Sequence, residues 1–335
     1  MRDPLLYPLT FMPVLRDYLW GGRRLETLFG RRLPPGIVAE SWEISGHPNG
    51  STIADAGYWQ GQSLSAIQEA LGERLVGTAG RWALARGKFP LLVKLLDAQQ
   101  HLSVQVHPDD AYALVHEHGE LGKTEMWYVL HADPGTELIR GLQPGVNRET
   151  FRRAAEAGNL EPLLHREPVR AGQVFAVPAG TVHALCAGAV VAEIQQNSDT
   201  TYRIYDWGRV GPDGRPRELH LAKALDVIDF SGAIGQDAPR ELQEGPDVRR
   251  VEVVRNRYFI VEEVTCAAGA SYAVECTGDT LEIWGCVAGE AAIAWDGAPV
   301  PLPAIRFALI PAGLAAFRIT AITPCTCLRA TLAPA

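Results

Sequence analysis

No apolar run in the sequence approaches the roughly 18 residues that indicate a membrane-spanning helix. The mildly apolar start is interrupted by Pro8 and Pro13, so we expect neither a membrane anchor nor a secretory signal. The six cysteines form no CxxC pair, which favours reduced thiols packed as small apolar side chains. The basic residues form no stripe and the net charge is −8, which argues against nucleic acid but not against a small anionic substrate. A cytoplasmic protein fits these features.

Short apolar runs separated by Gly, Pro, Asp and Asn recur along the chain, a pattern typical of a β-sandwich or barrel. The 335 residues, 47% of them hydrophobic, suffice for one large or two modest domains. Apolar residues at helical spacing predict three helices, over 63–76, 148–157 and 218–228. Ser63 and Asn147 are expected to cap the first two.

We place a domain boundary after the third helix, where Ser231-Gly232 precede a polar segment from Gly235 to Arg250. The predicted domains are therefore 1–230 and 231–335. No histidine follows His220, so the C-terminal domain cannot repeat a histidine-based site. Short strands are expected in that domain at Val251–Val254, Tyr258–Val264, Leu281–Val287, Ala291–Trp295 and Phe307–Ile310.

The segment from His101 to Asp110 carries the first candidate ligands. Read as a strand, it alternates strictly, with His101, Ser103, Gln105 and His107 on one face. A half-exposed surface strand would also alternate in this way. Surface strands usually carry Thr, Lys and Glu, however, whereas the His107 imidazole and the Gln105 amide oxygen suit a metal ion.

A second cluster follows at Gly122-Lys123-Thr124-Glu125, where an apolar strand begins. The two-residue period of a strand places Lys123 and Glu125 on the same face. Glu125 could be an ordinary surface acid, but its position at the start of the strand makes it a candidate carboxylate ligand. Between this cluster and His107, residues 110–119 are expected to form a helical excursion at the mouth of a barrel.

The third cluster has the spacing G-x5-P-x-G-x2-H from Gly172 to His183, and it resembles the second conserved motif of the cupin superfamily. A strand would enter a Pro-x-Gly turn, and the returning strand would direct one imidazole into the barrel. A lone histidine on an apolar strand is more often a core residue than a ligand. With Gln105, His107 and Glu125 available, His183 becomes a candidate fourth ligand. Such a mixed N/O set leaves room for water or substrate and suits Zn, Fe, Mn or Co.

A fourth cluster runs from Val191 to Asp206, with Glu193 and Gln195 on one face and Arg203 after a polar turn. Arg203 could be a surface arginine, because most basic residues of the chain are arginines. Lysine is rarer, and two of the four lysines, Lys94 and Lys123, fall beside the candidate ligands. Lys94 lies within an apolar strand, where an unpaired charge would be costly.

Taken together, the segments Ser103–Asp110, Gly122–Glu125, Pro178–His183 and Glu193–Arg203 resemble the type I mannose-6-phosphate isomerases, and Trp20-Gly21-Gly22 and Ala39–Ser45 fit as well. The resemblance implies a mainly β, double cupin-like architecture of two jelly-roll barrels with a few helices. It implies one zinc ion per chain on Gln105, His107, Glu125 and His183. It also implies Arg203 as the active-site arginine, and Lys94, Ser103, Lys123 and Glu193 in the substrate pocket. The C-terminal domain would then be a metal-free cupin-like domain.

The implied reaction interconverts an aldose and a ketose 6-phosphate through an enediol, with a phosphorylated hexose as substrate. Glu193 is our first candidate for the base, ahead of Lys123 or a metal-bound water. Two rival functions remain open at this point: an Fe(II) cupin dioxygenase and a non-catalytic sugar-sensing cupin. The phosphate-binding cations Lys94, Lys123 and Arg203 argue against the first, and intact ligands beside charged side chains argue against the second. Nothing in the sequence predicts the oligomeric state.

Overall fold

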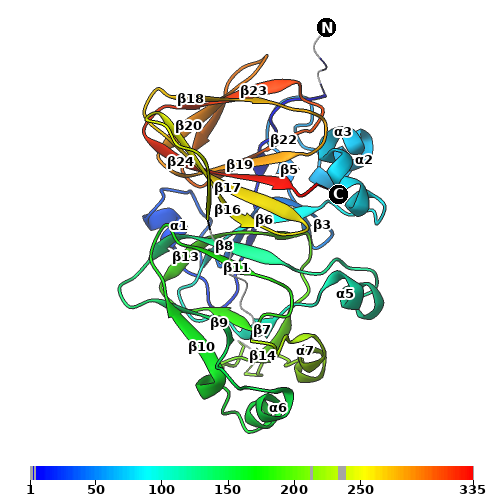
Figure 1. Cartoon of the computed structure of the whole chain (residues 1–335), viewed down its shortest axis with the longest axis vertical. Coiled ribbons are helices and arrows are strands. Elements are labelled where there is room, and N and C mark those ends of the chain that lie inside the picture. Colours follow the sequence, from blue (N-terminus) through cyan, green and yellow to red (C-terminus); the bar gives the residue numbers. More distant parts are fainter. Residues whose placement is uncertain (1–2, 4, 212–213, 233–238, 335) are drawn as a thin grey trace. The chain divides into compact units, whose positions relative to one another are not determined.

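The computed structural model describes residues 3, 5–211, 214–232 and 239–334, and it is built mainly of antiparallel strands (Figure 1). The mainly β architecture predicted from the sequence is therefore confirmed. The chain forms two compact units. Unit 1 comprises residues 1–14, 42–93 and 237–335, and unit 2 comprises residues 15–41 and 94–236.

The predicted division into 1–230 and 231–335 is a single cut, whereas the compact units are assembled from separated segments. The last segment of unit 1 begins at 237, close to the predicted boundary, although residues 235–238 of the predicted polar segment lie outside the described part of the chain. Residues 42–93 add strands and helices to the C-terminal part because they pack in the same unit. The roles expected for the two parts stay predictions.

Unit 2 contains two sheets that face the candidate site. The first has the order β10-β9-β12-β7-β14, and the second contains β11, β8 and β13 followed by β6. Their bounds are Leu164–Pro168 (β10), Glu137–Leu142 (β9), His183–Leu185 (β12), Val104–Val106 (β7), Tyr202–Tyr205 (β14), Val174–Val177 (β11), Glu125–Ala132 (β8), Ala189–Gln196 (β13) and Leu91–Asp97 (β6). The boundaries between the units fall inside β6, β3 (Glu40–His47) and β2 (Val14–Arg16).

Unit 1 contains a six-stranded sheet, β15-β16-β17-β24-β19-β22, and a four-stranded sheet, β18-β23-β20-β21. The six strands are Arg240–Gln243 (β15), Val248–Arg255 (β16), Phe259–Cys266 (β17), Cys325–Leu332 (β24), Glu282–Ala288 (β19) and Arg306–Ile310 (β22). The four are Ser271–Glu275 (β18), Ala316–Ala321 (β23), Glu290–Ala294 (β20) and Val300–Pro303 (β21). The short strands β1 (Phe11–Met12), β4 (Gly50–Ser51) and β5 (Ile53–Ala54) complete the unit. All five predicted C-terminal strands are present.

The helices are short, and α2, α5 and α6 begin at the polar caps Ser63, Asp109 and Asn147. The helix predicted over 63–76 is broken at Gly72, which has a φ of 52°, into α2 (Leu64–Leu71) and α3 (Glu73–Val76). Ser63 caps α2 by accepting a hydrogen bond from Ala66, and Asn147 caps α6 (Arg148–Glu156) in a reciprocal capping box. The remaining helices are α1 (Arg24–Thr27), α4 (Arg81–Leu84), α5 (Asp110–His116) and α7 (Leu221–Val227), with short 3₁₀ turns at Thr78–Gly80 and Glu161–Leu163.

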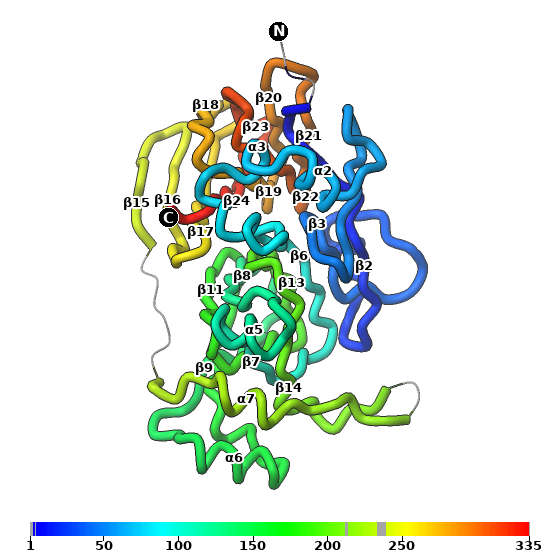
Figure 2. The backbone as a smooth tube through the Cα atoms, turned by 90° about the vertical axis from the view of Figure 1, so that its right-hand side faces the viewer, coloured from blue at the N-terminus to red at the C-terminus, as the bar shows by residue number. Residues whose placement is uncertain are grey.

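The predicted helical excursion between the first two ligand clusters is α5, which lies at one end of the strands β7, β8, β11 and β13 (Figures 1 and 2). On the outer face of the five-stranded sheet, Val104 and Val106 of β7 pack in one core cluster with Phe151 of α6 and Leu225 of α7. Because successive strand residues point to opposite faces, this packing turns Gln105 toward the interior of the barrel.

Candidate metal centre and pocket

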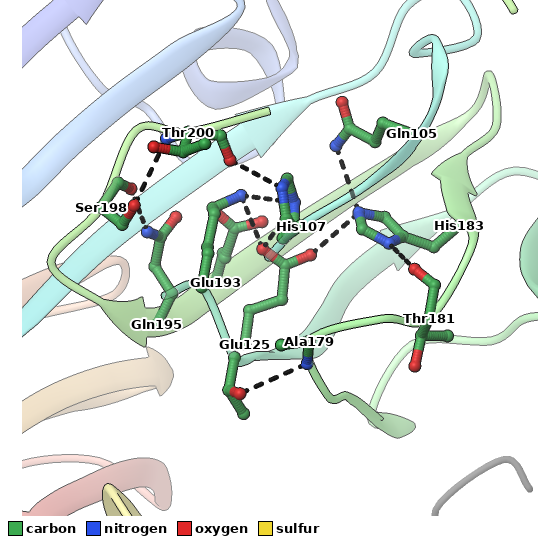
Figure 3. Close-up of polar contacts among 12 residues, drawn as sticks. Gln105, His107, Glu125, Ala179, Thr181, His183, Glu193, Gln195, Ser198 and Thr200 are labelled. Carbon is green, nitrogen blue, oxygen red and sulfur yellow. Dashed lines mark hydrogen bonds and ion pairs between the residues drawn. The ribbon is translucent and has the colours of Figure 1, made fainter. Parts of the chain in front are cut away.

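Three side chains converge in the interior of unit 2. Ligand atoms of His107, Glu125 and His183 all lie within 4.8 Å of one another, and the three residues are at most 1% exposed (Figure 3). Glu125 begins β8 and His183 begins β12, while His107 directly follows β7. The structure therefore brings together three of the four predicted ligands as one buried group that could hold a metal ion.

The fourth predicted ligand, Gln105, lies beside the same group. It pairs with His183 across the β7–β12 ladder, and its Nε2 is 3.2 Å from His183 Nε2. The amide nitrogen thus faces the ring, and Oε1 lies 3.5 Å from Ser103 Oγ. A half-turn of the amide would exchange the two atoms and present the oxygen that a metal requires.

Both histidines are oriented by backbone carbonyls. His107 Nδ1 lies 2.8 Å from Thr200 O, and His183 Nδ1 lies 2.9 Å from Thr181 O. Only a protonated Nδ1 can donate to a carbonyl, so Nε2 carries the free lone pair on each ring. Burial lowers the pKa of His183 to about 4 and that of His107 well below its usual value. Both imidazoles are therefore neutral, the form that binds metals.

Glu125 is the central acid of this group, and its environment opposes its charge. Burial, followed by the nearby Glu193 carboxylate, raises the pKa of Glu125 to about 7, although Lys123 acts in the opposite direction. Lys123 Nζ lies 2.7 Å from Glu125 Oε2 and 2.9 Å from His107 Nε2. The predicted pairing of Lys123 and Glu125 on one face is confirmed, and a cation already lies against two of the candidate ligands.

A cavity of about 270 Å³ opens beside these ligands. It is lined by every predicted substrate-binding and catalytic residue and by the predicted ligand Gln105. The lining also includes residues that the sequence did not single out as site residues: Tyr18, Trp20, Glu40, Leu96, Leu102, Asp199, Thr201 and Arg217. Trp20 and Glu40 belong to motifs that fit the family resemblance, Trp20-Gly21-Gly22 and Ala39–Ser45, but no role is predicted for them from the sequence. No sequence signal pointed to Arg217, which lies beyond the last motif.

Glu193 is held on one side by an indole and on the other by a lysine. Trp127, its cross-strand partner on β8, donates from Nε1 to Glu193 Oε2 at 2.8 Å. Lys94 Nζ lies 3.7 Å from Glu193 Oε1 and 3.5 Å from Glu40 Oε2, so the buried lysine is paired rather than isolated. Burial would raise the pKa of Glu193, but Lys123, Lys94 and the Trp127 hydrogen bond together lower it. The carboxylate is therefore ionised at neutral pH.

Arg203 approaches the cavity from β14, where it pairs with Gln105. Its Nη1 donates to Glu218 O at 2.9 Å, and its backbone NH donates to His220 Nδ1 at 3.1 Å. Burial and the nearby Arg217 lower the pKa of Arg203. Arg203 and Arg217 thus place two guanidinium groups at one part of the cavity, which suits an anionic group, although that of Arg217 already pairs with Asp206.

His101, which shares a predicted face with Gln105 and His107, does not join the group. The strand begins only at Val104, and the exposed His101 ring packs 4.9 Å from the ring of Trp207. The alternation proposed for residues 101–107 therefore holds for the last part of the segment only.

Comparison with known proteins shows which family this chain resembles. A family model described as the catalytic domain of type I phosphomannose isomerase matches residues 9–131. The mannose-6-phosphate isomerase ManA of Bacillus subtilis (strain 168) is 36% identical over 318 residues, covering 95% of this chain and 97% of that protein. The mannose-6-phosphate isomerase of Streptococcus mutans is 45% identical over 221 residues, covering 66% of this chain and 67% of that protein.

Two solved structures have folds similar to that of this chain. The crystal structure of the mannose 6-phosphate isomerase from Bacillus subtilis superimposes with a TM-score of 0.87 at 33% identity, covering 96% of this chain and 99% of that chain. A structure from Archaeoglobus fulgidus, described as a putative mannosephosphate isomerase, superimposes with a TM-score of 0.77 at 21% identity, covering 98% of each chain, and supports the fold alone.

The fold and the buried group define a cupin-fold protein with a candidate metal centre. Within that class, the chain belongs to the type I mannose-6-phosphate isomerase family. The predicted family and the cupin architecture are thus confirmed. Among the residues that the structure describes, no helix is both long and apolar enough to span a membrane.

Proposed function

We propose that this chain is a zinc-dependent isomerase that interconverts mannose 6-phosphate and fructose 6-phosphate. The observation that carries the proposal is the buried His107–Glu125–His183 group, which lies against Gln105 and Lys123 in the lining of a cavity that also contains Lys94, Arg203 and Arg217. A phosphorylated hexose needs this combination, because its phosphate requires cations and its C1–C2 unit requires an electrophile and a base. The family membership supports the same substrate.

In the proposed site, Gln105, His107, Glu125 and His183 hold the zinc ion, one per chain. Nitrogen and oxygen donors in a buried setting fit zinc, and both histidines are neutral. When bound, zinc supplies Lewis-acid polarisation of the sugar oxygens at C1 and C2. Its charge would also balance that of the buried Glu125, whose Oε2 has Lys123 as its cationic partner among the described residues.

Glu193 is the proposed base that moves the proton between C1 and C2. Its pKa is lowered and it lines the cavity, so it is ionised and accessible to substrate. Trp127 holds one oxygen, Oε2, while Oε1 lies at the longer distance of 3.7 Å from Lys94 Nζ. Proton abstraction leaves an enediolate, whose negative charge Lys123 and Arg203 are placed to stabilise.

Lys94 and Ser103 are proposed to bind substrate oxygens at the wall of the cavity. Lys94 is charged because the carboxylates of Glu40 and Glu193 raise its pKa, which outweighs the effect of burial. The positive region near Arg203 and Arg217 is the proposed location of the phosphate. We also propose a cytoplasmic location, where the cysteines stay reduced.

The test is conversion of mannose 6-phosphate to fructose 6-phosphate before chelation, after chelation, and after addition of zinc. We expect activity that vanishes with the chelator and returns with zinc. Restoration with other divalent metals at equal occupancy measures the preference for zinc. A folded, zinc-loaded protein that binds the substrate without turning it over would refute the assignment and favour a sugar-sensing role.

A further inference from the structure

Gln195 is a buried side chain to which the proposed mechanism assigns no role. It is 0% exposed and lies on β13 directly opposite Glu125 of β8 in the sheet register. Cross-strand partners project from the same face of a sheet, so the Gln195 side chain lies next to that of Glu125. Its Nε2 donates two hydrogen bonds of 2.7 Å, to Gln196 O and to Ser198 O, and Figure 3 shows the second of them.

The orientation of this amide follows from its partners. Both groups that it meets are carbonyl oxygens, which can only accept, so the NH₂ end must face them. This side chain thereby joins both ends of the turn at residues 196–198, in which the Ser198 NH also donates to Gln196 O at 2.8 Å. Such a turn has few ways to pair its carbonyls when it is buried, and each unpaired one would cost free energy.

The same turn leads to the carbonyl that orients His107. The Thr200 NH donates to Ser198 Oγ at 3.3 Å, and Thr200 O accepts from His107 Nδ1 at 2.8 Å. The chain of contacts therefore runs from Gln195 through Ser198 and Thr200 to the ring of a proposed ligand.

A neighbouring contact ties the turn to the other proposed ligand strand. Gln196 Oε1 accepts from the Thr124 NH at 2.9 Å, and the Gln196 NH donates to Thr124 O at 3.1 Å. Thr124 lies between Lys123 and Glu125. Movement of the turn would therefore disturb His107 and Glu125 together.

We propose that Gln195 is a positioning residue of the metal centre, an inference that rests on the proposed function. By closing the 196–198 turn, it fixes the Thr200 carbonyl and thus the tautomer and direction of His107. The predicted consequence is on metal affinity, because outer contacts that orient a ligand typically change affinity by about 10–100-fold. Gln195 does not itself touch the substrate, and it does not line the cavity.

The test compares Gln195→Met with Gln143→Met. Methionine keeps the length of glutamine and removes its donors. Gln143 Nε2 donates to a carbonyl as well, Leu164 O at 3.1 Å, but it lies outside the ligand group. Zinc affinity is measured on the apoprotein by competition with a chromophoric chelator. We expect a loss of about 10–100-fold for Gln195→Met and no change for Gln143→Met.

Two further measurements separate positioning from general stability. At saturating zinc, Gln195→Met should regain most of its kcat with an unchanged KM, because the substrate contacts are intact. Ser198→Ala, which removes the other tether of the turn and leaves the buried amide in place, should lower zinc affinity in the same direction by a smaller factor. It serves as the decisive variant if Gln195→Met fails to fold.

Wild-type zinc affinity in the folded variants would overturn the inference, even if their melting temperatures fall. That result leaves the proposed function intact, because the wild-type enzyme still requires zinc. A wild-type protein that binds no zinc in the same assay would refute both.

Discussion

Each unit buries a glutamate in a trio with an indole and a cation: Glu282, Trp284 and Arg329 in unit 1, and Glu193, Trp127 and Lys94 in unit 2. The two glutamates differ in how completely their oxygens are paired. In unit 1, Glu282 accepts from Trp284 Nε1 at 2.8 Å and forms a bidentate pair with Arg329 at 2.8 and 2.6 Å. In unit 2, Glu193 accepts from Trp127 at the same 2.8 Å, but Lys94 stays 3.7 Å from its second oxygen.

This difference separates a structural ion pair from a site prepared for a ligand. Arg329 also donates to Glu262 at 3.2 Å, so the charges in unit 1 neutralise one another and no oxygen of Glu282 needs a further partner. Glu193 instead directs a loosely paired oxygen toward a cavity, beside ligand atoms that converge on one point. Burial is common to both trios; what distinguishes the one beside the candidate metal centre is incomplete pairing.

Removal of Glu125 should have the largest effect. Glu125→Ala takes away the carboxylate of the ligand group, and the Lewis-acid contribution of a metal is worth several kcal/mol of transition-state stabilisation. We expect kcat/KM to fall by about 10³-fold or more, together with bound zinc. Steady-state kinetics and metal analysis of the same preparation check this. Full activity in a variant that has lost its zinc would remove the centre from the mechanism.

Glu193→Gln is the next largest expected effect, and it tests the unit 2 trio directly. The amide keeps the shape and can still accept from Trp127, but it cannot take a proton. We expect kcat to fall by about 10²-fold or more, as for loss of a general base, with zinc content unchanged. Exchange of the C1 or C2 hydrogen with solvent deuterium should fall in parallel. If exchange continues at the wild-type rate, another group is the base.

The candidate ligands could be proposed from the sequence because each lies in a short motif. The Pro178–His183 turn and the alternation of Gln105 and His107 on one strand fix direction within a few residues. The trio around Glu193 could not be found in this way. Trp127 and Lys94 lie on other strands, and only the sheet register brings them to the carboxylate.

The strands of the fold were also predicted only where a local sequence pattern marks them. The five C-terminal strands that apolar runs predict are present, but β15, β18, β21, β23 and β24 are not predicted. Of these, β24 lies between β17 and β19 in the six-stranded sheet. One face of β24 carries Cys325, Cys327 and Arg329, so it does not read as an apolar run. The Arg329 charge is tolerated there only because two strands distant in sequence supply its carboxylates.

For the trio of unit 1 we predict a loss of stability without a loss of activity. Glu282→Gln replaces the bidentate partner of Arg329 and leaves a largely buried guanidinium with Glu262 alone. We expect the free energy of unfolding to fall by about 3 kcal/mol, with kcat and zinc content of the folded enzyme unchanged. Urea denaturation and kinetics at a temperature where both proteins are folded measure the two effects. A drop in kcat at full zinc occupancy would contradict a purely structural role.

The smallest expected effect concerns a closed ion pair within unit 2. Asp206 accepts a bidentate pair from Arg217 at 2.8 and 2.6 Å and a third hydrogen bond from Arg209 at 2.5 Å. Burial would raise the pKa of Asp206, but these arginines lower it below the ordinary value of 3.8. Like Glu282 and unlike Glu193, Asp206 has both of its carboxylate oxygens hydrogen-bonded to arginine.

Asp206→Asn should therefore cost stability in a pH-dependent manner. A carboxyl whose pKa is depressed in the folded state stabilises the fold fully above its ordinary pKa, and this contribution is lost as the pH falls through the folded pKa. The difference in unfolding free energy between wild type and variant should be about 2 kcal/mol at pH 7 and should shrink below pH 3.8. Urea denaturation at pH 7 and pH 3 measures both values. A difference that persists unchanged at pH 3 would mean that shape, rather than the charge of Asp206, holds the two arginines.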